Sequence, residues 1–111
     1  MAGETYNVII DEGAKMQLRD IISYLRDNAS VDTARHVRTN ILETITNLSF
    51  MPERYMVLYE DTEAKIVYRR ALKWKYIIVF TIQEAAMTIK VVDICHSAQD
   101  PKRLIDRLSN L

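Results

Sequence analysis

The sequence is poor in residues that interrupt regular structure, with two glycines and two prolines among 111 residues. This scarcity predicts long helices and strands with few loops, and it argues against a disordered chain. The single cysteine, Cys95, excludes an internal disulfide, and its place in an apolar run predicts a small buried side chain. No apolar run approaches the ~20 residues of a membrane span, and the residues before Tyr6 show no signal peptide. We therefore expect a cytoplasmic protein without a membrane segment.

An excess of charge of either sign is also missing. Lys and Arg together number 15, as do Asp and Glu, so the formal net charge is zero. This excludes a basic field over the whole molecule, and any nucleic-acid role would have to use a local patch. Hydrophobic residues make up 49% of the chain, which is enough for a core. The length predicts one domain spanning residues 1–111.

Two stretches have the apolar periodicity of helices. The first follows Asp11, a suitable helix cap, and should end near Asn28. The second can be capped by Ser30 or Asp32, and it must end before Pro52, because proline lacks the N–H that a helix interior needs. About three residues join the two helices, which predicts an antiparallel hairpin. Spacings of three and four place these apolar residues on one face of each helix: Ala14, Leu18, Ile21, Ile22 and Leu25, then Ala34, Val37, Ile41, Ile45 and Leu48.

Runs of β-branched and aromatic residues predict four strands, over residues 6–10, 65–72, 75–82 and 87–95. The third run is apolar on both faces, as expected of a central strand covered on both sides. The turn before it must lie near Lys73 and Trp74, although it lacks Gly, Asn and Asp. Residues 53–63 have no clear period and predict a packed loop with a short extended piece. Asp100 and Pro101 suit the start of a terminal helix, as cap and first-turn residue.

The resulting order, β-α-α-β-β-β-α, predicts an α+β fold. Its mostly antiparallel sheet should be packed by the helical hairpin and by the short C-terminal helix.

Several local strings, taken in order, resemble the RelE/ParE toxins. The most specific is VVDICHSAQDP, residues 91–101, which is similar to the family's last strand, with a His at its end and Asp-Pro opening a helix. The strings YRRAL (68–72) and YIIVF (76–80) resemble the family's Arg-bearing strand and the strand after it, with Phe80 where Tyr is commoner. The leading strand and helix also fit, as does the Leu48-x-x-x-Pro52 exit of the second helix. The resemblance covers about Tyr6 to Leu108.

The resemblance implies the toxin of a bacterial type II toxin–antitoxin system, associated with plasmid stabilisation and growth inhibition. Its partner would be a cognate antitoxin that covers an apolar surface of the toxin, in a homodimer or a toxin–antitoxin hetero-oligomer. ParE-like members inhibit DNA gyrase, whereas RelE-like members cut mRNA on the ribosome as metal-independent endoribonucleases. The neutral charge, and Ser97 in place of an aromatic residue after His96, favour the ParE-like branch. A RelE-like nuclease, or an inactive homologue that only binds its antitoxin, remains the alternative.

Metal-free RNA cleavage needs proton transfer and cations that stabilise the charge on phosphorus. In the RelE-like alternative, His96 could donate a proton, and Arg69, Arg70 and Lys73 could face the phosphate. A structural interpretation competes for each residue. Neighbouring arginines on a strand point to opposite faces, so one is expected to be solvated and the other paired with a carboxylate. Lys73 near a turn would be solvated, and His96 would be hydrogen-bonded to a loop.

Five residues are candidates for contact with a protein partner: Leu104, Leu108, Leu111, Tyr59 and Trp74. For Trp74, packing against the helical hairpin is the plainer alternative. A metal site is poorly supported, because His36 and His96 are far apart and Cys95 has no partner at ligand spacing. No Gly-rich phosphate loop is present, and we expect no cofactor.

Overall fold

The computed structural model describes residues 5–109, and its elements follow the predicted order with one strand added. The elements are β1 (Asn7–Ile10), α1 (Glu12–Asn28), α2 (Val31–Asn47), β2 (Val57–Asp61), β3 (Ile66–Lys73), β4 (Tyr76–Gln83), β5 (Thr88–His96) and α3 (Pro101–Ser109). Short 3-10 turns at Pro52–Arg54 and Glu84–Ala86 precede β2 and β5.

The helices begin where local side chains can satisfy their free N–H groups. Asp11 accepts a hydrogen bond from the N–H of Gly13 at 3.1 Å, and Ser30 accepts one from the N–H of Thr33 at 3.0 Å. Ser30, rather than Asp32, is therefore the cap of α2. Two residues, 29 and 30, separate α1 from α2, so the helices form the expected hairpin.

The strands form one mixed sheet in the order β1-β5-β4-β3-β2. Only β1 and β5 are parallel, and the other pairs are antiparallel, which confirms the predicted α+β fold. The added strand, β2, lies at the sheet edge, in the segment for which the sequence predicts a packed loop with a short extended piece. A register shift between Val57 and Tyr59 breaks its alternation, which explains why periodicity alone does not reveal it.

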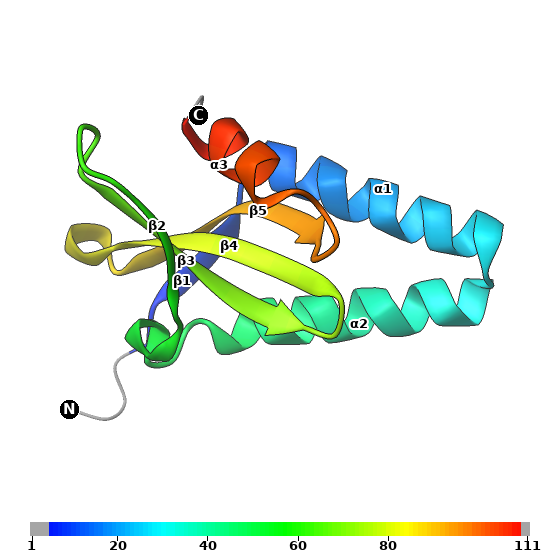
Figure 1. The fold of residues 1–111 in the computed structure, drawn as a ribbon. Coiled ribbons are helices and arrows are strands. Elements are labelled where there is room, and N and C mark those ends of the chain that lie inside the picture. Colours follow the sequence, from blue (N-terminus) through cyan, green and yellow to red (C-terminus); the bar gives the residue numbers. More distant parts are fainter. Residues whose placement is uncertain (1–4, 110–111) are drawn as a thin grey trace.

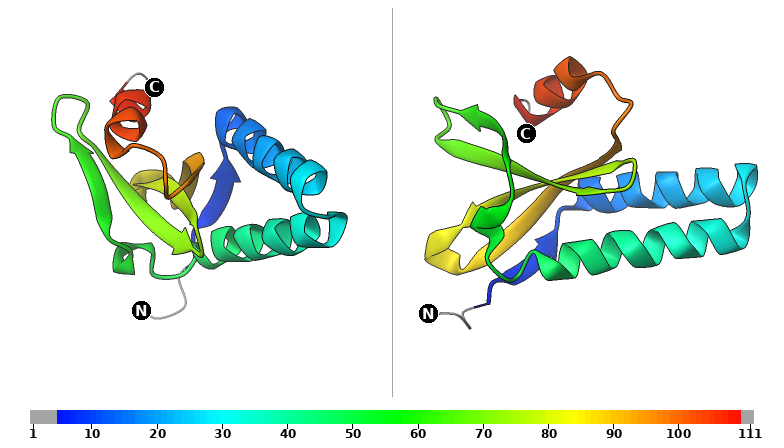
Figure 2. Two further views of the ribbon diagram at one scale, coloured as in Figure 1. Left: turned by 45° about the vertical axis from the view of Figure 1, so that its right-hand side comes forward. Right: turned by 60° about the horizontal axis from the view of Figure 1, so that its bottom comes forward.

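Each face of the sheet is covered by a different layer (Figures 1 and 2). The hairpin of α1 and α2 covers one face, and α3 packs on the other. The central strand β4 serves both cores: Ile78 and Phe80 pack on the hairpin side and Val79 on the α3 side, as its doubly apolar pattern predicts. Opposite Val79 and Phe80, β5 carries Val92 as the extra residue of a bulge.

The turns take up the backbone conformation that glycine would normally supply. Among residues 5–109, four non-glycine residues have positive φ, namely Met51, Lys65, Trp74 and Met87. Met51 directly precedes the 3-10 turn at Pro52–Arg54, and the other three lie in turns that lead into strands. The helical elements within residues 5–109 include none that is long and apolar enough to cross a membrane.

Candidate functional site

The register of the sheet separates the predicted catalytic residues onto opposite faces. Lys73 pairs with Tyr76, and Tyr76 pairs with His96, so these side chains lie in one row on the hairpin face. Arg70 pairs with Val79, and Val79 pairs with Asp93, which forms a row on the α3 face. The His96 imidazole and the Arg70 guanidinium therefore have the sheet between them.

Neither arginine of β3 forms a salt bridge with a described residue, which corrects the expected pairing with a carboxylate. Arg69 donates from Nη1 to the carbonyl oxygens of Glu53 at 3.2 Å and Tyr55 at 2.8 Å. It thereby fastens the irregular segment before β2 to the sheet. Arg70 Nη2 lies 3.1 Å from the sulfur of Met56. The two arginines do point to opposite faces, as their adjacent positions predict.

Trp74 stands at the tight turn between β3 and β4, where it adopts φ 53°. Its ring stacks on His36 of α2, with centroids 5.2 Å apart, and Lys73 Nζ lies 5.0 Å from the Trp74 centroid. Despite these contacts Trp74 is 53% exposed. It therefore packs against the hairpin while about half of its apolar surface stays exposed.

His96 closes β5 and is exposed to solvent. Its Nδ1 accepts a hydrogen bond from the N–H of Ala98 at 3.0 Å, and its ring meets Tyr76 edge-on at 5.6 Å. The hydrogen bond to the following loop matches the structural interpretation of this histidine. Burial raises the pKa of the Tyr76 phenol, so this neighbour stays protonated and is a poor base. Among the described residues, no three His, Cys, Asp or Glu side chains are grouped to hold a metal ion.

Two of the leucines proposed for partner contact, Leu104 and Leu108, pack inside the molecule. Leu104 and Leu108 of α3 are buried against β-sheet residues including Tyr68 and Val79. Tyr59 is half-buried and its ring stacks on Tyr68 with centroids 6.0 Å apart. Leu111 lies outside the described residues.

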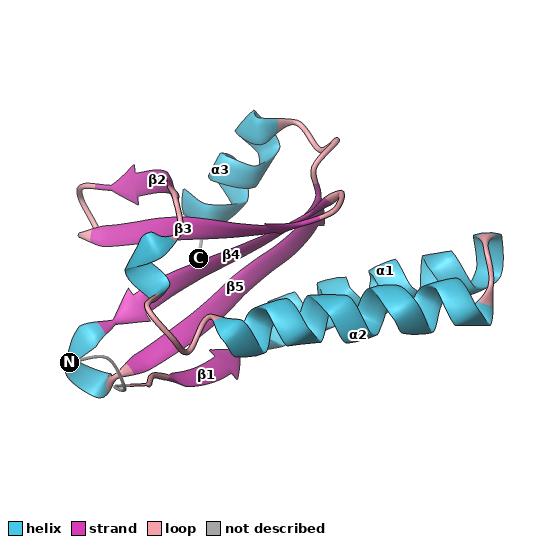
Figure 3. Ribbon diagram, turned by 90° about the horizontal axis from the view of Figure 1, so that it is seen from below, coloured by secondary structure: helices cyan, strands magenta, loops and turns pink. Residues whose placement is uncertain are grey.

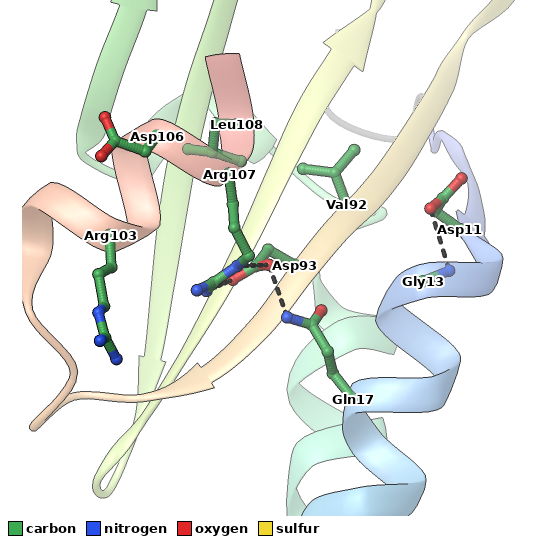
Figure 4. Close-up of a pocket in the computed structure, with 9 residues that line it drawn as sticks. All are labelled: Asp11, Gly13, Gln17, Val92, Asp93, Arg103, Asp106, Arg107 and Leu108. Carbon is green, nitrogen blue, oxygen red and sulfur yellow. Dashed lines mark hydrogen bonds and ion pairs between the residues drawn. The ribbon is translucent and has the colours of Figure 1, made fainter. Parts of the chain in front are cut away.

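A polar network around the buried Asp93 holds α3 against the sheet, and the sequence did not predict it (Figure 4). Asp93 of β5 accepts from Arg107 Nη2 at 2.9 Å and Nε at 3.2 Å, and from Gln17 Nε2 at 2.7 Å. Gln17 Oε1 accepts from the N–H of Ile94 at 3.1 Å, and Arg107 also reaches Gln99 Oε1 at 3.1 Å. The network joins α1, β5 and α3. The signal available in the sequence was a lone carboxylate inside the apolar run of residues 91–95.

The network also sets the chemistry of its neighbours. The hydrogen bond to Asp93 raises the pKa of Arg107. Burial, helped by the nearby negative charge of Asp93, raises the pKa of the Cys95 thiol to about 11. A thiol of this kind is inert near neutral pH. A cavity of about 550 Å³ lies beside the network, between the start of α1 and α3 (Figure 4).

The fold is shared with solved toxin–antitoxin structures. The chromosomal ParDE system of P. aeruginosa superposes with a TM-score of 0.68 at 13% identity, over 85% of this chain and 98% of that chain. The RelBE2 toxin–antitoxin complex of Mycobacterium tuberculosis gives a TM-score of 0.63 at 15% identity, over 87% and 97% of the two chains. The archaeal RelE–RelB complex of Pyrococcus horikoshii gives 0.57 at 18% identity, over 86% and 99%.

At such identities the solved structures establish the fold alone, and they include both ParE and RelE systems. Comparison with curated protein sequences gave no match. The family model described as "ParE toxin of type II toxin-antitoxin system, parDE" matches residues 8–101, which is most of the chain. The protein is therefore a member of the ParE toxin family, the toxin component of a type II toxin–antitoxin system.

Proposed function

We propose that this toxin inhibits DNA gyrase and that a cognate antitoxin neutralises it. The observation that carries the gyrase assignment is the separation of Arg70 and His96 by the sheet. A ribonuclease site needs its proton donor and its phosphate-binding cation within reach of one phosphate. Membership of the ParE family supports the same choice.

RelE-like cleavage of mRNA is the second candidate, because two of the solved structures with this fold are RelE systems. In that case the hairpin face would have to supply the chemistry, through His96 and Lys73. Arg69 is less available, since two backbone carbonyls occupy its guanidinium.

The antitoxin surface that we propose lies on the α3 face of β3, beside the part that α3 covers. Met56 and Leu72 are 63% and 54% exposed, and they flank Arg70 on this face. Trp74 follows at the adjacent turn. Apolar side chains grouped in this way are typical of a protein contact. Tyr24 is also exposed, but it belongs to α1 and is not part of this group.

Exchange of the apolar side chains for carboxylates tests this surface. The double substitution Met56→Asp and Leu72→Asp should weaken antitoxin binding at least 100-fold, because two buried apolar contacts would become buried charges. Titration calorimetry with the cognate antitoxin measures the change. Tyr24→Asp is the matched control and should leave the affinity within twofold. An unchanged affinity in the double variant would place the antitoxin elsewhere.

The gyrase assignment is tested by supercoiling assays with purified gyrase. Wild-type toxin should leave plasmid DNA relaxed, and His96→Ala should inhibit gyrase as well as the wild type does. A translating ribosome with reporter mRNA provides the parallel measurement. mRNA cleavage that is abolished by His96→Ala would establish the RelE-like alternative instead.

A further inference from the structure

A basic groove runs along the helical hairpin, outside the surfaces considered above. It lies between α1 and α2, has a volume of about 600 Å³, and carries four cationic side chains. Lys15, Arg19 and Arg26 come from α1, and Arg38 comes from α2. Asp20 is the only carboxylate in its lining. In a chain of zero net charge, this is a local concentration of positive charge.

Helical geometry explains how the sequence forms the groove. Lys15, Arg19 and Arg26 follow spacings of four and seven residues, so they share one stripe of α1 that is about 16 Å long. The α1 carboxylates Asp20 and Asp27 fall further round the helix, whereas Glu12 shares the stripe at its N-terminal end and pairs with Lys15 at 3.2 Å. The hairpin then brings Arg38 to the opposite wall. The hairpin of α1 and α2 extends beyond the sheet (Figure 3), and Lys15, Arg19 and Arg26 are exposed on it.

The central cations of the groove are free to bind a ligand. Lys15 forms a salt bridge with Glu12 at 3.2 Å, and Arg26 lies 3.9 Å from Asp27. Arg19 and Arg38 are exposed, and neither forms an ion pair with any residue from 5 to 109. Two guanidiniums on facing walls, with no carboxylate partner, form a site for an anion with several charges.

The groove suits a phosphate backbone better than an amphipathic peptide. Its apolar residues, Ile10, Leu18, Ile22 and Leu42, are buried or half-buried, so they present little surface for an apolar anchor to cover. Duplex DNA carries one phosphate per ~3.4 Å of helix axis on each strand, so a stripe of this length meets several phosphates whatever the base sequence. An acidic protein segment would need carboxylates at matching positions.

We infer that this groove binds the phosphate backbone of duplex DNA, without reading its sequence. This inference rests on the proposed function, because an inhibitor of gyrase acts where DNA is bound, and it assigns the toxin a contact with that DNA. Binding should be weak and salt-dependent, with a Kd of roughly 1–100 μM, as expected for a few phosphate contacts.

Fluorescence anisotropy with a labelled 20-base-pair DNA of mixed sequence tests the inference. The variant Arg19→Gln with Arg38→Gln should weaken binding at least tenfold, and it should lower the slope of log Kd against log salt by about 2. The matched control is Lys102→Gln with Arg103→Gln, which removes two exposed charges from α3 and should change Kd less than threefold. Glutamine is a good helix former, and circular dichroism should show that both variants keep the fold.

Three results would overturn the inference. The first is no saturable DNA binding by the wild type at low salt, and the second is an equal loss in the control variant. The third is equal or tighter binding of poly-glutamate or a 20-base-pair RNA through the same arginines, which would assign the groove to an acidic protein or to RNA. DNA binding without gyrase inhibition would contradict only the proposed function. Gyrase inhibition by a toxin that does not bind DNA would contradict only this inference.

Discussion

Asp93 is the residue on which three elements converge. Its side chain is 6% exposed and receives hydrogen bonds from α1 and from α3. A buried carboxylate is tolerated only when its hydrogen-bonding capacity is met, and here Arg107 and Gln17 meet it. The same contacts fix the position of α3. The apolar contacts of Leu104 and Leu108 hold the helix on the sheet but do not define its orientation, whereas the hydrogen bonds from Arg107 to Asp93 do.

Removal of Arg107 should therefore cost more than the loss of an ordinary surface charge. Arg107→Ala leaves the Asp93 carboxylate buried with Gln17 alone. We expect a loss of about 2 kcal/mol in unfolding free energy, below the full value for a buried pair because Arg107 is 38% exposed. Urea denaturation measures the loss. Lys102→Ala on the same helix should stay within about 0.5 kcal/mol, and an equal effect of both substitutions would remove the special role of Arg107.

The Cys95 thiol predicts a pH dependence. Its pKa rises from 9.0 to about 11 in the folded protein, so the folded state favours the neutral thiol. The stabilising contribution is complete below pH 9 and is lost as the pH rises toward 11. We expect native Cys95 to resist alkylation at pH 8 and to react once urea unfolds the chain. Part of the alkaline loss of stability should disappear in Cys95→Ala, and rapid alkylation of the native protein would contradict the account.

Lys65 carries backbone strain that glycine would relieve. Its φ of 57° in the turn between β2 and β3 costs an ordinary residue roughly 1 kcal/mol. Lys65→Gly should therefore raise the melting temperature by about 4 °C or more. Lys75→Gly is the matched control in the neighbouring hairpin, because Lys75 has no positive φ, and this substitution should lower stability. The prediction fails if both substitutions lower the melting temperature equally.

At the scale of elements, local signals predict the helices well and the edge strand poorly. Caps and apolar spacing lie within a few residues of each other, so Asp11 and Ser30 mark the helix starts directly. β2 exists because it pairs with β3, and a register shift hides its alternation. The sequence predicts the turn near Lys73 and Trp74, where the structure has it. It does not predict the positive φ of Trp74, because that backbone conformation depends on the two strands that the turn joins.

The candidate site likewise has features that the sequence predicts and features that depend on tertiary structure. Strand alternation predicts that Arg69 and Arg70 face opposite sides, and the structure confirms it. The partners of Arg69 could not be predicted, because they are backbone carbonyls 14 and 16 residues earlier in an irregular segment. The apolar side of α3 was clear from sequence, whereas its burial by Tyr68 and Val79 depends on tertiary packing.

At the scale of the whole molecule, the sheet divides the functions that we propose. The α3 face carries the apolar group of Met56 and Leu72, which we assign to the antitoxin. The free walls of the hairpin carry the basic groove, which we assign to DNA. The chain has no net charge, but its basic side chains are concentrated in the groove of the hairpin. This local concentration allows a neutral protein to combine the two roles.

The most direct test of the account is a supercoiling assay run beside an mRNA cleavage assay, with wild-type toxin, His96→Ala and Arg70→Ala. The account predicts that wild-type toxin blocks supercoiling, that mRNA stays intact, and that His96→Ala keeps full potency. Cleavage of mRNA on translating ribosomes, abolished by either substitution while gyrase remains active, would contradict it.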